Sequence, residues 1–197
     1  MQQRREGPGA EVGGQQEGQG EAVSAPSSLV EIRPERPEDL ERVRDVNQQA
    51  FGQPDEGRIV DAVRRRGDAI TSLVAVVNSR IVGHILFSRV TIESPEGVWL
   101  AAGLAPMAVV PEFQRKGVGG RLVEEGLKAC REAGYGIAVV LGHPTYYPRF
   151  GFKPAHTRGI FLEFDVPEDA FMVMELKPGA MDGCSGTARY LPEFSAA

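Results

Sequence analysis

The sequence has little cysteine, no long apolar run and no excess of positive charge. Its two cysteines, Cys130 and Cys184, form neither a CxxC pair nor a metal-ligand spacing, so we expect no metal site. The longest apolar runs, Leu73–Val77 and Ile137–Leu141, fall far short of the roughly 20 residues that a membrane span needs. The N-terminus also lacks the hydrophobic segment of a secretion signal. We therefore expect a cytoplasmic protein with reduced thiols and no membrane association.

The charge balance argues against one class of partner. The chain carries 22 basic and 27 acidic residues, a net charge of -5. Proteins that bind nucleic acid non-specifically need basic surface to replace the counterions of the phosphates. We therefore expect no nucleic-acid partner, whereas a cationic substrate is compatible with this balance.

The length and composition fit one domain flanked by two tails. The 197 residues suffice for a sizeable core. Residues 1–27 are mostly Gly, Gln, Glu, Ser and Pro, and such a segment cannot bury enough surface to offset its ordering entropy. We predict a disordered tail over 1–27, one domain over 28–178 and a loop-like C-terminal tail over 179–197.

The domain shows an ordered series of strand and helix patterns. Apolar periodicity predicts a strand at 28–34, two helices within 36–68, strands at 71–77, 81–92 and 99–110, a helix at 117–133, and strands at 135–142, 160–164 and 170–176. This order predicts an α/β domain with a mixed sheet. Pro106 lies inside the fourth predicted strand, at 99–110, and a proline cannot donate to the ladder. The strand should therefore carry a bulge or an unpaired side at that point.

The run QRKGVGG, Gln114–Gly120, joins this strand to the following helix. Gly117, Gly119 and Gly120 allow positive φ angles and a close approach of a ligand to the backbone. The first N–H groups of a helix have no partners within it, and the helix dipole adds partial positive charge there. Together with Arg115 and Lys116, the turn is typical of a site for a phosphate or diphosphate.

Two better-known phosphate motifs do not fit this run. A P-loop requires GxxxxGK followed by Ser or Thr, which is absent. A dinucleotide fingerprint requires a third glycine where Leu122 stands. A flexible turn with solvated basic side chains remains the alternative from the glycines alone.

The surrounding residues resemble the GNAT superfamily of N-acetyltransferases. The segment GLAPMAVVPEFQRKGVGGRLVEEGL is similar to the acetyl-CoA signature of that family. This signature is a strand that ends in apolar-x-Val-x-Pro, followed by the pattern [RQ]-x-x-G-x-[GA]. The segment LGHPTYYPRFGF resembles the Tyr-x-x-x-Gly-Phe ending of the family, at Tyr147, Gly151 and Phe152, and is similar to the YhbS-like branch. The resemblance implies a mostly antiparallel mixed sheet flanked by helices, whose splayed central strands form a slot for CoA.

The resemblance also implies a cofactor-binding set. The diphosphate of acetyl-CoA would lie on backbone N–H groups of the glycine-rich turn, and the pantetheine arm would pair with the strand before it. The implied contacts are Met107, Ala108, Val109, Gln114, Arg115, Lys116, Gly117, Val118, Gly119 and Gly120. No metal is implied.

The catalytic residues implied are a tyrosine and a base. Tyr147 matches the family tyrosine that protonates the leaving thiolate, although Pro144 and Pro148 bracket it and Tyr146 is an alternative. His143 ends the fifth central strand, and histidine can act as a base near neutral pH. A backbone N–H near Ala108 or Val109 would stabilise the oxyanion. His84 is expected to be structural, and Glu112 a solvated or capping acid.

We therefore expect transfer of an acetyl group from acetyl-CoA to a primary amine of a small molecule or peptide by direct attack. A non-catalytic acyl-CoA sensor and a transferase for a longer acyl group are the alternatives. The substrate-side segments, residues 37–68 and the late strands, carry no recognisable acceptor motif. A homodimer is compatible with the sequence.

Overall fold

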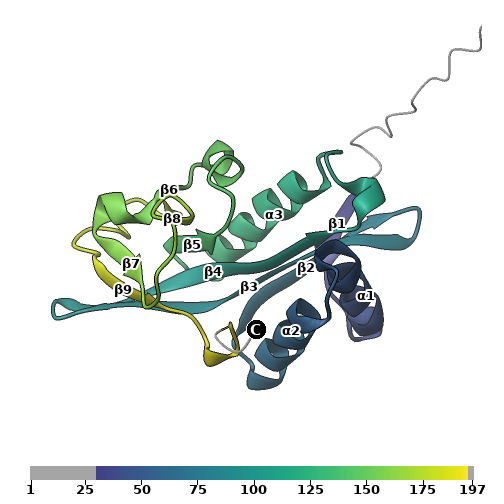
Figure 1. The fold of residues 1–197 in the computed structure, drawn as a ribbon, viewed down its shortest axis with the longest axis horizontal. Coiled ribbons are helices and arrows are strands. Elements are labelled where there is room, and N and C mark those ends of the chain that lie inside the picture. Colours follow the sequence, from purple (N-terminus) through teal and green to yellow (C-terminus); the bar gives the residue numbers. More distant parts are fainter. Residues whose placement is uncertain (1–29, 195–197) are drawn as a thin grey trace, which may run out of the picture.

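The computed structural model describes residues 30–194 and consists of a twisted sheet with helices on both faces (Figure 1). The tail predicted over 1–27 lies outside the described residues. The sheet order is β1-β2-β3-β4-β5-β8-β6, with β9 paired to β3 and β7. Neighbouring strands on the main path are antiparallel except β4 and β5, which are parallel. The predicted mixed, mostly antiparallel sheet is therefore confirmed.

The first half of the chain follows the predicted order closely. Strand β1 (Glu31–Pro34) leads to a 3-10 turn (Pro37–Asp39) and to helices α1 (Leu40–Phe51) and α2 (Asp55–Arg66). Gly67 ends α2 with a φ of 77°, a left-handed conformation that glycine adopts without strain. Strands β2 (Ala69–Val77), β3 (Arg80–Ser94) and β4 (Gly97–Val109) form an antiparallel meander.

Alternating side chains of β3 fill two cores, one on each face of the sheet. Ile85 and Phe87 pack in the core that contains Leu122 and Val123 of α3 (Val118–Glu132). Leu86 packs with Val43 and Val60 in the core under α1 and α2. Figure 1 shows α1 and α2 on one side of the sheet and α3 on the other. The period of two along β3 thus fixes which helix lies on which face.

The central strands separate near Pro106, as the sequence predicts. Strand β5 (Ile137–Leu141) pairs with β4 only from Ala102 to Leu104. The pairing of β4 with β3 shifts register at the same place, between the pairs Phe87↔Leu104 and Ile85↔Met107. Two residues of β4, Ala105 and Pro106, therefore face one residue of β3, which is a β-bulge. Beyond it the β5 side of β4 has no partner strand among the described residues.

The C-terminal segment differs from the prediction. Strands β6 (Lys153–Pro154), β7 (Ile160–Leu162) and β8 (Phe171–Glu175) precede it. The residues after 178 were expected to be loop-like, but Gly186–Arg189 form β9, and Leu191 is buried behind it. Strand β9 pairs with Thr91–Glu93 of β3 and with β7. Four residues carry too little periodicity to indicate a strand, and the pairing depends on partners distant in sequence.

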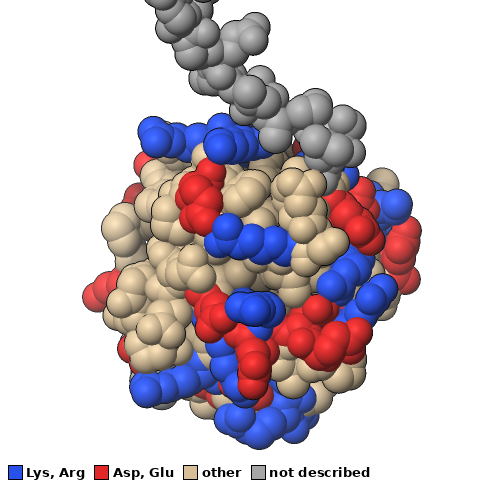
Figure 2. Space-filling model, turned by 90° about the vertical axis from the view of Figure 1, so that its right-hand side faces the viewer, with Lys and Arg blue, Asp and Glu red and all other residues tan. Residues whose placement is uncertain are grey.

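Basic and acidic side chains are interleaved on the surface. Figure 2 shows this mixture on the face that lies at the right of Figure 1. Ion pairs join them, such as Arg80 Nη2 to Glu112 Oε1 at 2.7 Å and Arg44 Nε to Asp61 Oδ2 at 2.7 Å. Glu112, which the sequence suggested as a solvated acid, is half exposed in this pair.

A buried polar cluster lies beneath α1 and α2. Asn47 donates from Nδ2 to the Val43 carbonyl at 2.8 Å and lies 3.2 Å from His84 Nδ1, so Nδ1 accepts and the proton of the neutral ring is on Nε2. That nitrogen lies 2.9 Å from Ser72 Oγ, and the Ser72 hydroxyl donates to Glu35. Glu35 also pairs with Arg64. His84 is fully buried and structural, as expected.

This cluster predicts the pH dependence of folding stability. Burial alone raises the pKa of Glu35, but its bonds with His84, Ser72 and Arg64 outweigh this and lower the pKa from 4.5 to about 2. Burial lowers the pKa of His84 below 6.5, more than Glu35 raises it. In both cases the unfolded chain binds protons first as the pH falls, so acid destabilises the fold. We expect the free energy of unfolding to fall steadily below pH 6.5 in urea titrations. A constant value down to pH 4 would contradict these assignments.

Candidate active site

The separated part of β4 presents backbone groups to one side. Val110 N–H donates to the Val82 carbonyl of β3 at 3.0 Å. Because the direction of backbone groups alternates along a strand, the N–H of Ala108 also faces β3, whereas those of Met107 and Val109 face the β5 side. Gln114 Nε2 reaches the Val109 carbonyl on that side at 2.9 Å. Among the described residues, Met107 and Val109 thus form a strand edge that pairs with no other strand.

The glycine-rich turn connects this edge to α3. Arg115 and Gly117 both have positive φ angles, 59° and 84°, and Gly117 is the residue before the helix. The first helical bond runs from Arg121 N to the Gly117 carbonyl at 3.2 Å. The N–H groups of 118–120 therefore precede the helical ladder and point toward the turn, and the residue before the helix, Gly117, has no side chain to cap them. This is the geometry of an anion site.

Gly119 keeps the space in front of these groups open. A Cβ placed there would lie 2.8 Å from Tyr146 Oη and 3.6 Å from the Met107 side chain. A larger side chain would consequently fill the cradle between the turn, β4 and Tyr146. At Gly117 the limit is conformational, since its φ of 84° disfavours any other residue.

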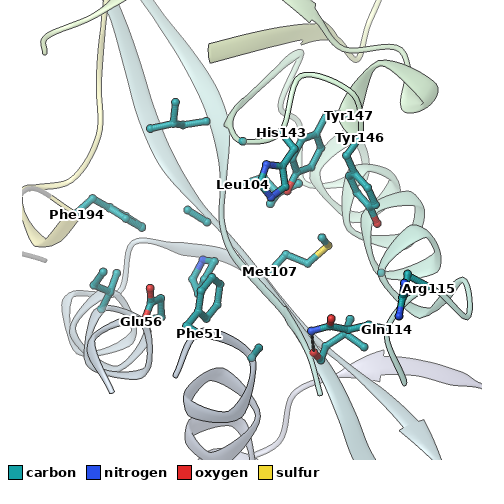
Figure 3. A pocket seen from close by; sticks show the side chains of 18 residues that line it. Phe51, Glu56, Leu104, Met107, Gln114, Arg115, His143, Tyr146, Tyr147 and Phe194 are labelled. Atoms are coloured by element: carbon teal, nitrogen blue, oxygen red, sulfur yellow. Dashed lines mark hydrogen bonds between the residues drawn. The ribbon is translucent and has the colours of Figure 1, made fainter. Parts of the chain in front are cut away.

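A cavity of about 680 Å³ joins the free edge, the turn and the ends of α1 and α2. Apolar residues dominate its walls. The polar or charged side chains that line it are Glu56, Gln114, Arg115, His143, Tyr146 and Tyr147. Figure 3 shows Arg115 and Gln114 at one end, Glu56, Phe51 and Phe194 across β4 at the other, and Met107 between them. The two charges, Arg115 and Glu56, thus stand at opposite ends.

The two tyrosines occupy different parts of this cavity. Tyr147 is 7% exposed, and burial, with a smaller effect of Tyr146, raises its pKa to about 12. Its ring packs against Gly142, where any Cβ would collide with it. The Tyr146 ring stands at 77° to it with centroids 5.1 Å apart, and its hydroxyl lies over the first turn of α3. In Figure 3 the two rings point in different directions, with His143 beside Tyr147.

The structure brings together part of the predicted set. Of the residues that the sequence suggested, those that line the cavity are Met107, Val109, Gln114, Arg115, Gly119, His143, Tyr146 and Tyr147. Gly117, Val118 and Gly120 belong to the turn and the first turn of α3. Lys116 instead places Nζ 5.5 Å from the centre of the Phe113 ring. Ala108 is 1% exposed and directs its N–H to β3. Neither its side chain nor its N–H faces the cavity, so the predicted contact of Ala108 with the cofactor is wrong.

Several cavity residues escaped the sequence interpretation. They are Ala50, Phe51, Glu56, Ile59, Leu141, Gly142 and Phe194. Glu56 belongs to the first turn of α2, where acids are common because the helix dipole favours them. Phe51 is exposed at the end of an amphipathic helix. An exposed aromatic residue next to a helix end was the available signal, but it does not identify a site by itself.

Two further features are absent from the described part of the chain. None of the helices in residues 30–194 is long and apolar enough to cross a membrane. Within the same range, no three His, Cys, Asp or Glu side chains group as metal ligands would.

Comparisons with known proteins agree with this geometry. Residues 31–155 match the family model described as acetyltransferase (GNAT) domain. The chain is 40% identical over 134 residues to the uncharacterized N-acetyltransferase YjhQ of Escherichia coli K12, covering 66% of this chain and 74% of that protein. It is 32% identical over 165 residues to the uncharacterized N-acetyltransferase YhbS of the same strain, covering 83% of this chain and 98% of that protein.

Solved structures of this family share the fold. The crystal structure of E. coli YhbS in complex with CoA matches with a TM-score of 0.78 at 30% identity, over 85% of this chain and 92% of that one. A GNAT acetyltransferase from Brucella melitensis in complex with acetyl-CoA matches with a TM-score of 0.68 at 35% identity, over 84% and 97%. With a glycine-rich turn, a separated β4 and a family match over most of its folded part, the chain belongs to the GNAT family of acetyltransferases.

Proposed function

We propose that the protein transfers an acetyl group from acetyl-CoA to a primary amine. The observation that carries this proposal is the free edge of β4, which runs directly into the anion cradle at the start of α3. A cofactor with an amide-containing arm and a diphosphate needs both features, in this order. The CoA and acetyl-CoA complexes of the two relatives support the same choice of ligand.

The cavity residues fit acetyl-CoA in three respects. The N–H groups of 118–120 and the Arg115 side chain suit the diphosphate, and Gly119 leaves the room it needs. The backbone edge of Met107 and Val109 suits the amides of the pantetheine arm as an added strand. The widening between β4 and β5 suits the acetyl end. Ala108, with its N–H toward β3, is not part of this proposal.

Acetyl-CoA supplies a thioester whose carbonyl carbon accepts the amine nitrogen. Overall a C–N bond forms, the C–S bond breaks, the amine gives up one proton and the CoA thiol takes up one. An alkylammonium has a pKa of about 10.4, so removing its proton at pH 7 costs about 4–5 kcal/mol at about 1.36 kcal/mol per pKa unit. A base at the cavity lowers this cost. His143, which lines the cavity at the end of β5, is the base that we propose.

Tyr147 is the hydrogen-bond donor that we propose for the leaving sulfur, which takes its proton from water. Its hydroxyl is protonated throughout the physiological range because burial raises its pKa to about 12. With Ala108 set aside, the N–H groups of Met107 and Val109 on the open side of β4 are the backbone donors that the pantetheine amides and the thioester carbonyl oxygen share. Tyr146 stays the alternative donor, although its hydroxyl lies nearer to the start of α3.

Two buried thiols, Cys130 and Cys184, are free. Free thiols fit a reducing compartment, and we propose the cytoplasm. A sensor that binds acetyl-CoA without turnover is the second candidate function. No observation on the described residues favours it over catalysis.

Thermal unfolding with acetyl-CoA, ATP and NAD in parallel tests the binding half of this proposal. Acetyl-CoA at about 100 times its dissociation constant should stabilise the fold by about 2.7 kcal/mol. For a domain of this size that raises Tm by roughly 5–10 °C. The Gly119→Val variant should keep the basal Tm within a few degrees and lose the shift. An equal shift with ATP, or none with acetyl-CoA, would reduce the turn to a general anion site.

A further inference from the structure

The end of the cavity opposite Arg115 is built for an apolar group. Phe51, at the end of α1, is 43% exposed, and Figure 3 shows it with Phe194 on this side of β4. Ala50, next to Phe51 in α1, and Ile59 of α2 also line the cavity. Large apolar side chains left open to solvent in a concave site commonly mark a ligand surface. A hydrocarbon group bound here would cover them.

One carboxylate stands within these apolar walls. Glu56 accepts a hydrogen bond from Gln53 Nε2 to Oε1 at 3.3 Å. Its other oxygen, Oε2, is buried and has no hydrogen-bond partner in the described part of the chain. A buried carboxylate oxygen without a donor is unfavourable, and a ligand that brings an N–H donor removes that cost.

The place of Glu56 in the helix does not by itself explain this orientation. An acid in the first turn of α2 is favourable because of the helix dipole, and Asp55 in the same turn fills that role at the surface. Asp55 accepts from Arg58 Nη1 at 3.0 Å, whereas Glu56 faces the cavity. Figure 3 shows its carboxylate beside Phe51, across β4 from the tyrosines.

The cavity therefore separates its charges. Among the described residues that line it, Arg115 and Glu56 carry the full charges, and they stand at opposite ends. An anionic group is attracted to Arg115 and repelled by Glu56, whereas a cation is attracted to Glu56 and repelled by Arg115. The cavity of about 680 Å³ must also hold the arm of the co-substrate, so the room for the acceptor is small.

We infer that the acceptor is a small primary amine carried on an alkyl or arylalkyl group, and that Glu56 Oε2 binds its ammonium. This inference rests on the acetyl transfer proposed above and adds the substrate class. The apolar walls hold the hydrocarbon part, and the single carboxylate selects one positive charge. Glu56 is a substrate-binding residue. The proton that the amine loses before attack goes to His143, the proposed base, which lies across β4 from Glu56.

The test compares the wild type with Glu56→Gln and with the matched control Asp55→Asn. Steady-state rates of CoA thiol release are measured with 2-phenylethylamine, hexylamine, spermidine and a short peptide with a free N-terminus. We expect the two apolar monoamines to be the best acceptors. Glu56→Gln should raise their KM roughly tenfold or more, as expected for a lost bond to a charged group, with the KM for acetyl-CoA unchanged. Asp55→Asn should behave as the wild type.

A binding measurement separates recognition from turnover. Calorimetric titration of 2-phenylethylammonium into the CoA-bound protein should show at least tenfold weaker binding for Glu56→Gln, and 2-phenylethanol should bind weakly to both proteins. An unchanged Tm shift with acetyl-CoA shows that the variant is folded. If spermidine or the peptide were the preferred acceptor, or if Glu56→Gln matched the wild type, the inference would be overturned and the acetyl transfer would stand. If no amine released thiol, the proposed function itself would fail.

Discussion

Replacing Tyr147 with phenylalanine should lower kcat roughly 10²-fold and leave the KM for acetyl-CoA within a factor of two or three. The substitution removes one hydroxyl from a ring that keeps its packing against Gly142 and Phe152. The donor is needed when negative charge develops on sulfur, so its loss affects the rate more than binding. Steady-state kinetics of thiol release with a saturating amine measure both constants.

The pKa of Tyr147 decides how it helps. At about 12 it lies roughly 3.5 units above a thiol pKa near 8.5, so complete proton transfer to the thiolate would be uphill by about 5 kcal/mol. We therefore expect Tyr147 to act as a hydrogen-bond donor to sulfur, with water completing the protonation. Because a group with this pKa stays protonated up to pH 10, kcat should show no loss on the alkaline side from Tyr147.

Tyr146→Phe is the matched control. The Tyr146 hydroxyl lies over the start of α3, so its removal should affect acetyl-CoA binding more than kcat. If Tyr146→Phe lowered kcat roughly 10²-fold and Tyr147→Phe did not, the roles of the two tyrosines would have to be exchanged. If neither variant lost more than a few-fold, neither hydroxyl would serve the leaving group.

Glu35→Ala should destabilise the fold by about 3 kcal/mol, the lower end expected for breaking a buried pair. Glu35 is 6% exposed at its side chain and pairs with Arg64, which is 18% exposed. The loss leaves His84 Nε2 and the Ser72 hydroxyl without their carboxylate. Arg64 keeps Asp61 at 2.8 Å, which limits the damage. Urea unfolding at pH 7 measures the change.

Glu38→Ala provides the matched control for this stability prediction. Glu38 lies three residues away, is 67% exposed and pairs with Arg36 at 3.9 Å. Exposed ion pairs contribute little, so its loss should cost less than about 1 kcal/mol. Equal effects of the two substitutions would show that the cluster beneath α1 and α2 is not energetically special.

Much of the fold could be predicted because its signals are local. The helix over 118–132 has an apolar stripe and a glycine-rich start. In the strand before it, Pro106 predicts the bulge because a proline cannot donate a hydrogen bond to the neighbouring strand. The period of two in β3 determines its two faces. Each of these features follows from neighbouring residues, so a single sequence is enough.

The acceptor end of the site could not be predicted, because it is assembled from distant segments. Phe51 and Glu56 lie near the start of the described residues and Phe194 at their end, and no spacing rule joins them. Strand β9 likewise depends on β3, almost a hundred residues earlier in the chain. The direction of the Ala108 N–H depends on the register between β3 and β4, which the sequence leaves open.

The transfer of a labelled acetyl group tests the central claim most directly. The protein is incubated with acetyl-CoA that carries an isotopic label in the acetyl group and with each of the four amines, and products are analysed by mass spectrometry. We predict a labelled amide in amounts equal to the CoA thiol released, and none when the amine is omitted. Binding of acetyl-CoA without any labelled amide, or thiol release that yields only labelled acetate, would contradict the assignment of this protein as an N-acetyltransferase.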